Sequence, residues 1–170
     1  NAKVMASKLS RQRGRPLVEY LAISGGAGDG AFAAGLLAGW SKKGDRPQFE
    51  VVTGVSAGAL TAPFAYLGPE YDGRLQQIWT KYETDDLATP QVLAGLFGAD
   101  AFADSSGLAN LIAKYVDRKL LDRIAEEYRK GRVLLVATTN LDAQRPVIWN
   151  MGEIAANPHP YALELFRQVI

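Results

Sequence analysis

Three apolar segments, each typical of a buried strand, constrain the fold of this chain more than any other feature. Residues 17–23, 49–53 and 132–139 are mostly apolar, and the first two run through a glycine-rich turn directly into a helix-like segment. Buried strands separated by helices indicate a parallel sheet that is covered by helices. We therefore predict an α/β fold, a three-layer α/β/α sandwich with a mainly parallel sheet.

The composition agrees with a packed domain and excludes several classes of protein. The chain has 170 residues, of which 48% are hydrophobic and 22% charged, which is enough for one domain with a sizeable core. A net charge of +1 gives no general attraction to nucleic acid. Cysteine is absent, so disulfides and cysteine-ligated zinc are excluded. No apolar run reaches the roughly 18 residues of a membrane span.

The chain begins with a basic arm, residues 1–16, ahead of the predicted domain over residues 17–170. The arm carries five cations before the first acidic residue, Glu19: Lys3, Lys8, Arg11, Arg13 and Arg15. A peripheral contact between this arm and a membrane with anionic head groups stays open. The simpler interpretation is a solvated leader, because the arm lacks an apolar face.

Helical spacing of apolar residues predicts the helices. Over residues 31–43 it brings Phe32, Leu36, Leu37 and Trp40 to one side, which we expect to pack on the sheet. Further helices are predicted over residues 59–66, 71–82, 107–115 and 119–130, and a hairpin partner for the third strand over 146–149. Residues 85–103 mix apolar residues with glycines, which fits a lid or a loop packed on the core. Asp104 is a helix-cap candidate.

The second strand runs into Gly54-Val55-Ser56-Ala57-Gly58 and then into a helix. A strand that reverses sharply into a helix is the setting of a nucleophile elbow, in which Gly54 and Gly58 let the flanking segments pass closely. Ser56 would then be exposed at the helix N-terminus. There the N–H of Ala57 and the helix dipole favour negative charge on an acyl oxygen. A plain tight turn is the alternative interpretation of this short motif.

The first strand runs into a second glycine-rich turn, residues 24–30, which is again followed by a helix. Glycines leave backbone N–H groups bare at the start of such a helix, and bare N–H groups bind anions. In an acyl hydrolase the anion is the tetrahedral oxyanion. Such an enzyme needs two backbone N–H donors for this oxyanion, one beside the nucleophile and another from a separate strand-to-helix loop.

These two turns, in this order, resemble the patatin-like phospholipase family, over residues 21–32 and 52–60. The resemblance implies a serine lipid acyl hydrolase that uses a Ser-Asp dyad on lipid or other acyl-ester substrates, without histidine, metal or organic cofactor. Ser56 falls on the family's nucleophile. Ala27 stands where the family usually has a third glycine, and Asp29 where it often has Lys or Arg. The residues that fall on the oxyanion hole are Gly25, Gly26, Ala27, Gly28 and Ala57.

The aspartate that the resemblance implies lies in an Asp-Gly-Gly or Asp-Gly-Ala turn far downstream of the elbow. The Asp-Gly pairs of this chain, Asp29-Gly30 and Asp72-Gly73, do not fit that position. We therefore expect the chain to be the N-terminal part of a longer domain, truncated at its C-terminal side and inactive alone. Asp142 and His159 follow Ser56 in the order of an ordinary triad. Their simpler interpretation is as surface residues, with Asp142 capping a turn or paired with Arg145.

Two other classes of function stay open. Residues 26–31 satisfy the dinucleotide-binding pattern G-x-G-x-x-A, and Glu50 lies near the distance expected of a ribose-binding acid. Glu50 nevertheless starts its strand, whereas the ribose acid belongs at the strand's carboxyl end. A catalytically inactive lipid-binding module is the other alternative. The sequence leaves head group, acyl preference, oligomeric state and compartment open.

Overall fold

The computed structural model describes residues 18–26, 28, 30–84 and 106–170. The basic arm, the segment 85–103, Asp104, Ala27 and Asp29 lie outside the described residues. In chain order the elements are β1 (Tyr20–Ile23), α2 (Gly30–Lys43), β2 (Val51–Val55), α3 (Ala57–Leu67), the 3₁₀ turn η2 (Pro69–Tyr71), α4 (Asp72–Thr84), α6 (Ser106–Tyr115), α7 (Arg118–Arg129), β3 (Val133–Asn140), β4 (Arg145–Asn150), α8 (Met151–Ala156) and α9 (Ala162–Val169). Within the described part of the chain, no helix is long and apolar enough to cross a membrane.

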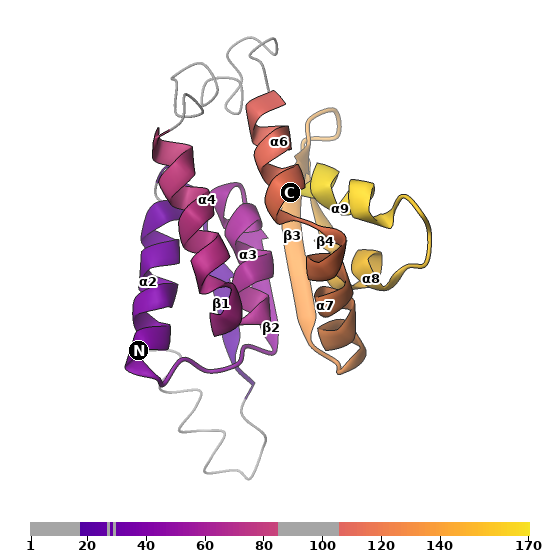
Figure 1. Ribbon diagram of the computed structural model, residues 1–170. Helices are drawn as coiled ribbons and strands as arrows, with labels where there is room; N and C mark the ends of the chain where they lie inside the picture. Colours follow the sequence, from indigo (N-terminus) through magenta and orange to yellow (C-terminus); the bar gives the residue numbers. More distant parts are fainter. Residues whose placement is uncertain (1–17, 27, 29, 85–105) are drawn as a thin grey trace.

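The strands form one sheet in the order β1-β2-β3-β4 (Figure 1). The first three strands are parallel, with Ile23 level with Gly54 and Gly54 level with Val136, and β4 returns antiparallel to β3 as the predicted hairpin. This confirms the predicted fold class, a mixed α/β fold whose mainly parallel sheet is flanked by helices. Because β1 to β3 are parallel, their carboxyl ends meet at one edge of the sheet, which we call the carboxyl edge.

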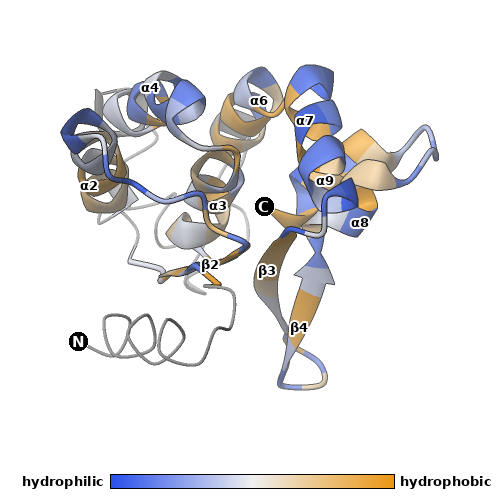
Figure 2. Cartoon of the chain, turned by 90° about the horizontal axis from the view of Figure 1, so that it is seen from below, coloured by the Kyte–Doolittle hydropathy of each residue, from blue (hydrophilic) through white to orange (hydrophobic). Residues whose placement is uncertain are grey.

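The described helices gather on one side of the sheet, as Figure 2 shows. Strand residues that point to this side, among them Val52, Leu134 and Val136, are fully buried. Helix α3 lies directly on them, and every residue from Gly58 to Leu67 is buried. The helix that starts at the elbow is therefore the centre of the core. Residues that point to the opposite side of the sheet, such as Thr53 and Leu135, are only half-buried.

Helix α2 packs through a face that overlaps the predicted one only in part. Leu37 is buried and Trp40 packs against the core, as predicted, whereas Phe32 and Leu36 are exposed. The remaining buried residues are Gly30, Ala34 and Ala38. The prediction was wrong for Phe32 and Leu36 because α2 packs against α4 and α3 rather than on the sheet. Close approach selects small residues there: a Cβ on Gly30 would lie 2.6 Å from Cζ3 of Trp79.

Two buried arginines hold the C-terminal end of α3. Arg46 donates to the carbonyl of Ala65 at 3.0 Å, and Arg132 donates to the carbonyl of Tyr66 at 2.5 Å. The last carbonyls of a helix lack partners within the helix, and cations near them also interact favourably with the helix dipole. The two arginines thus fix the end of α3 opposite Ser56, and with it the position of the whole helix.

Each of these arginines is also part of a buried ion pair. Arg46 contacts Asp72 at 2.7 Å, and Arg132 contacts Glu127 at 2.9 Å. Burial raises the pKa of Glu127, but hydrogen bonds from Lys130 and Arg132 outweigh it, so the pKa is lowered overall from its usual 4.5. Arg132 also lies over the ring of Tyr66, 4.3 Å from its centroid, and burial raises the pKa of that phenol to about 12.

Candidate functional site

Ser56 occupies the sharp turn between β2 and α3 in a backbone conformation that serine rarely adopts. Its φ is 54° and its ψ is −127°, and Gln144 is the one other described non-glycine residue with a positive φ. A serine that precedes a helix usually caps it by accepting a hydrogen bond from a backbone N–H of the first turn. Ser56 makes no such bond. The strained turn therefore presents an exposed hydroxyl that is not used to cap the helix.

The glycines on either side of Ser56 are required by the close passage of β1, β2 and α3. A Cβ on Gly54 would lie 2.9 Å from the backbone nitrogen of Ala59 and closer still to the carbonyl of Gly58. A Cβ on Gly58 would lie 2.8 Å from the carbonyl oxygen of Ser24 and closer still to that of Ile23. Backbone atoms cannot rotate away as a side chain can. The spacing of glycines in the motif is therefore a packing requirement of the elbow in this structure.

The glycine-rich loop after β1 contacts the serine directly. A Cβ on Gly25 would lie 2.9 Å from the Cβ of Ser56 and 3.4 Å from its Oγ. Gly26 has a φ of 146°, in the region that glycine adopts far more readily than other residues. The fold thus brings Gly25 and Ser56 together, although 31 positions separate them in the sequence. Gly28 belongs to the same loop and has open space around it.

The N-terminus of α3 adds a polar feature to the same place. Ala57 is the first residue of α3, and the first N–H groups of a helix have no partner within the helix. They point toward the turn that holds Ser56, where the helix dipole favours negative charge. Backbone N–H groups near a strained, exposed hydroxyl are the arrangement that can stabilise an oxyanion in acyl transfer.

A shallow apolar groove of about 470 Å³ adjoins the elbow on the less covered side of the sheet. It starts at Ser24, Gly54 and Val55 and continues across the strands. The remaining residues that line it are Ala22, Ile23, Thr53, Leu135, Val136, Ala137 and Ile148. Its volume lies within the usual range of small-molecule sites, about 300–1,000 Å³. The lining has the apolar character that suits a hydrocarbon chain.

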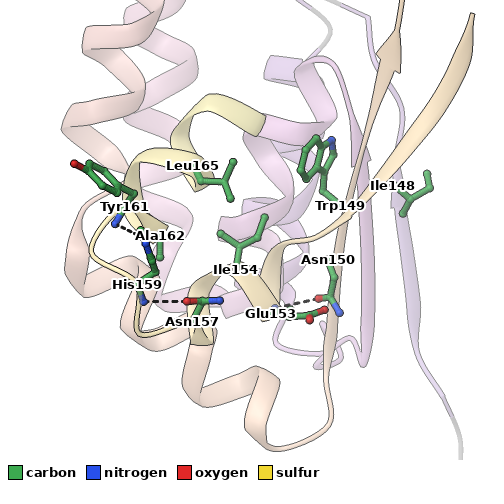
Figure 3. A pocket seen from close by; sticks show the side chains of 10 residues that line it. All are labelled: Ile148, Trp149, Asn150, Glu153, Ile154, Asn157, His159, Tyr161, Ala162 and Leu165. Atoms are coloured by element: carbon green, nitrogen blue, oxygen red, sulfur yellow. Dashed lines mark hydrogen bonds between the residues drawn. The ribbon is translucent and has the colours of Figure 1, made fainter. Parts of the chain in front are cut away.

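His159 lies in a different groove, of about 560 Å³, between β4, α8 and α9 (Figure 3). Its Nδ1 accepts a hydrogen bond from the backbone N–H of Tyr161 at 3.2 Å, and its own backbone N–H donates to the side chain of Asn157. A triad histidine instead donates from Nδ1–H to its acid. His159 is therefore tied to its own loop, and neither its place nor its bonding matches a base for Ser56.

The candidate carboxylates also lie apart from Ser56. Asp142 is exposed in the β3–β4 hairpin. The turn of this hairpin is stabilised by a hydrogen bond in which the side-chain oxygen of Asn140 accepts from the backbone N–H of Ala143 at 2.8 Å. Asp72 forms an ion pair with Arg46 at the start of α4. Glu50 accepts a hydrogen bond from the N–H of Glu19 at the amino end of β2, opposite the glycine loops. This position does not fit a ribose-binding acid.

Among the described residues, no group of three or more His, Asp or Glu side chains is placed to hold a metal ion. Sequence reasoning missed the two buried arginines and the apolar groove beside the elbow. An isolated Arg gives no signal of burial, and the groove is formed by residues from several different strands. The closeness of Gly25 to Ser56 was indicated by the sequence, because both turns follow strands of one predicted parallel sheet and so lie at the same edge.

The structure has a strained serine between a parallel strand and a buried helix of an α/β sheet, which is the geometry expected of a nucleophile elbow. Comparison with protein-family models gives the family: the model of the patatin-like phospholipase matches residues 21–167, and the chain belongs to this family. Comparison with curated proteins and with solved structures gave no match. The family acts on lipid substrates, and membership supports lipid acyl hydrolase activity in general.

Proposed function

We propose that this protein is a serine acyl hydrolase that cleaves phospholipids or other lipid esters, with Ser56 as nucleophile. The observation that carries the proposal is the closeness of Gly25, in the glycine-rich loop after β1, to Ser56, whose hydroxyl is exposed on a strained turn. In acyl transfer, a serine hydroxyl attacks the substrate while backbone N–H groups of a neighbouring loop hold the oxyanion. Family membership supports a lipid as the class of substrate. Residues 17–170 then form part of the hydrolase domain, preceded by the basic arm 1–16.

The reaction would proceed through an acyl-enzyme. Ser56 Oγ attacks the ester carbonyl carbon as a base takes its proton, and the carbonyl oxygen becomes an oxyanion. Backbone N–H groups of the Gly25–Gly28 loop and of Ala57 stabilise that charge. Collapse of the tetrahedral intermediate releases the alcohol, which receives the proton from the base. Water then attacks the acyl-serine by the same route and frees the fatty acid and Ser56.

The base is proposed to be an aspartate from outside residues 1–170, forming the Ser-Asp dyad that the family resemblance implies. No described carboxylate is hydrogen-bonded to Ser56, and both candidates in the chain, Asp142 and His159, are placed elsewhere. Without a base, a serine hydroxyl is a weak nucleophile. We therefore expect residues 1–170 alone to show little or no turnover.

The apolar groove beside the elbow is proposed to receive the acyl chain. It begins at Ser24, Gly54 and Val55, so a chain whose carbonyl lies at Ser56 would enter it directly. Its walls are aliphatic or small, and burial of a hydrocarbon chain against them is favourable in proportion to the apolar area removed from water. No metal or organic cofactor takes part in this chemistry.

Hydrolysis of a fluorogenic ester by the full-length protein tests the proposal. Ser56→Ala is expected to lower kcat/KM at least a thousandfold, since it removes the nucleophile. Ser41→Ala is the matched control: Ser41 lies on α2, bonded to Arg46, and its loss is expected to leave kcat/KM nearly unchanged. Substantial turnover by a folded Ser56→Ala variant would rule out Ser56 as the nucleophile.

A further inference from the structure

The buried side chain of Trp79 joins the two segments that carry the proposed oxyanion donors. Trp79 lies on α4, which packs against both α2 and α3 (Figure 1), and it is only 3% exposed. Gly30 is the last residue of the glycine-rich loop and the first of α2, and Ala57 is the first residue of α3. Trp79 contacts Gly30 directly and reaches Ala57 through the side chain of Thr61.

The six-membered ring of the Trp79 indole lies against the backbone of Gly30. A Cβ on Gly30 would lie 2.6 Å from Cζ3 of Trp79 and closer still to Cζ2 and Cη2. No side chain therefore separates the ring from the start of α2. Because protein interiors are closely packed, the size of this ring sets how near the start of α2 lies to α4.

The indole nitrogen of Trp79 is hydrogen-bonded to the first turn of α3. Nε1 of Trp79 donates to Oγ1 of Thr61 at 3.2 Å, and the same Oγ1 donates to the carbonyl of Ala57 at 3.2 Å. Thr61 is fully buried, and hydrogen bonds in such surroundings are stronger than in water. This chain of bonds ends at the residue that directly follows Ser56.

Stabilisation of an oxyanion depends on the spacing of donors that come from two separate segments. The proposed donors are backbone N–H groups of residues 25–28 and of Ala57, and backbone groups cannot adjust by changing rotamer. A displacement of about 1 Å in an active site can cost about a hundredfold in rate. The pairing of β1 with β2 and the closeness of Gly25 to Ser56 fix these segments from the sheet. Trp79 holds them from the helical layer.

We propose that Trp79 is a positioning residue for the oxyanion hole beside Ser56, because its indole spaces the start of α2 from the first turn of α3. The inference rests on the proposed function, since it gives Trp79 a role in the same site. Trp79 acts through Gly30 and Thr61 and does not touch the substrate. A displaced donor weakens the hold on the charged oxyanion more than on the neutral ester, so the effect falls on kcat rather than on KM.

Hydrolysis of a short, water-soluble fluorogenic ester by the full-length protein tests the inference. Trp79→Phe removes the Nε1 donor and the ring atoms at Gly30, and it is expected to lower kcat about ten- to a hundredfold with KM changed less than about twofold. The matched control is Trp40→Phe, the same change near the far end of α2, where Trp40 packs edge-on against Phe49. Its kcat is expected to equal that of the wild type.

Inhibition by a short alkyl trifluoromethyl ketone gives a second readout. The ketone oxygen becomes an oxyanion when Oγ of Ser56 adds to the carbonyl carbon and the base takes the serine proton. Trp79→Phe is therefore expected to weaken inhibition by about the same factor as it lowers kcat. Inhibition as strong as that of the wild type overturns the inference.

The contact at Gly30 is tested by a pair of substitutions. Gly30→Ala is expected to lower kcat about tenfold in the wild type, because the added methyl group displaces the indole. In the Trp79→Phe background the same change is expected to cost less than about twofold, since the smaller ring leaves room for the methyl group. Equal losses in the two backgrounds overturn the inference, because the contact would then not transmit the effect.

A purely structural role for Trp79 predicts a different result. It lowers the folded fraction, measured by circular dichroism, and leaves kcat per folded molecule unchanged, which overturns the inference. If Trp79→Phe does not fold, Thr61→Val replaces it, because valine keeps the shape of threonine without its hydroxyl. We expect Thr61→Val to lower kcat about three- to tenfold with KM unchanged, and an unchanged kcat overturns the inference.

The Ser56→Ala variant separates this inference from the proposed function. Loss of turnover in Ser56→Ala with a wild-type kcat in Trp79→Phe overturns the inference and leaves the proposed function standing. Substantial turnover by folded Ser56→Ala overturns the proposed function, and the role of Trp79 with it.

Discussion

Gly58→Ala tests how closely α3 passes β1 at the elbow. Gly58 is the second residue of α3, and in an ordinary helix a Gly→Ala change stabilises by about 0.5–1 kcal/mol. Here the added Cβ would lie 2.8 Å from the carbonyl oxygen of Ser24 and closer still to that of Ile23. Both are backbone atoms, so β1 or α3 must move. Over-packing of this kind costs about 1–3 kcal/mol, and two backbone clashes place the cost near the upper end.

Gly35→Ala is the matched control, because Gly35 is also inside a helix but a methyl group added there would meet no other part of the structure within 4 Å beyond the helix's own nearby backbone. Urea unfolding followed by tryptophan fluorescence gives both free energies of unfolding, provided that the slopes are equal. We expect Gly58→Ala to lower the free energy of unfolding by about 2–3 kcal/mol and Gly35→Ala to raise it by about 0.5–1 kcal/mol. In a thermal melt these changes correspond to a melting temperature lower by about 4–12 °C and higher by about 1–4 °C. If Gly58→Ala is as stable as Gly35→Ala, helix propensity alone governs the site and the described approach of α3 to β1 is wrong.

Three further predictions concern the buried end of α3. Arg132→Met is expected to destabilise by roughly 2–4 kcal/mol in urea unfolding, because it leaves the carboxylate of Glu127 with Lys130 as its remaining partner and removes the donor to the carbonyls of Phe49 and Tyr66. Adding Glu127→Leu should recover part of the loss, and no recovery would contradict the ion-pair argument. Tyr66→Phe is expected to be neutral or stabilising by up to about 1 kcal/mol, since the buried hydroxyl of Tyr66 has no hydrogen-bond partner in the described structure. A clear loss of stability would show that this hydroxyl has a hydrogen-bond partner. Because the folded-state pKa of Glu127 is lowered from 4.5, the stabilisation that its ionised carboxylate contributes is present above that pH and is lost as the pH falls through the lowered value. When the pH is reduced from about 6 to about 3, the urea midpoint of Glu127→Gln should therefore decrease less steeply than that of the wild type. Equal slopes in variant and wild type would contradict the lowered pKa.

The strands and the two glycine turns could be predicted from the sequence because each depends on local pattern. Apolar runs identify residues that are buried in a sheet, and the elbow glycines follow from a turn between strand and helix. The buried face of α2 could not be predicted in the same way. Its periodicity pointed to Phe32 and Leu36, whereas packing against α4 selected Gly30 and Ala34, and the shape of a neighbouring helix is not visible in local spacing.

The candidate site, too, could be predicted from the sequence only where it depends on neighbouring residues in the chain. Ser56 and the glycine loops were identifiable from adjacent residues, and the resemblance to a family joined them. The contact between Gly25 and Ser56 depends on β1 and β2 being neighbours in register, which only the fold supplies. The roles of Arg46 and Arg132 depend on carbonyls at the far end of α3, from segments distant in the sequence. Interactions of that kind leave no sequence motif.

Labelling with a fluorophosphonate, followed by peptide mass spectrometry, tests the central claim most directly, because such reagents react with activated serines and not with ordinary ones. The full-length protein is compared with residues 1–170 and with its own Ser56→Ala variant. The account predicts a covalent adduct on Ser56 in the full-length protein and none on residues 1–170, since the base is proposed to lie outside them. An adduct on a different serine, or none in the folded full-length protein, would contradict the assignment of Ser56 as the nucleophile.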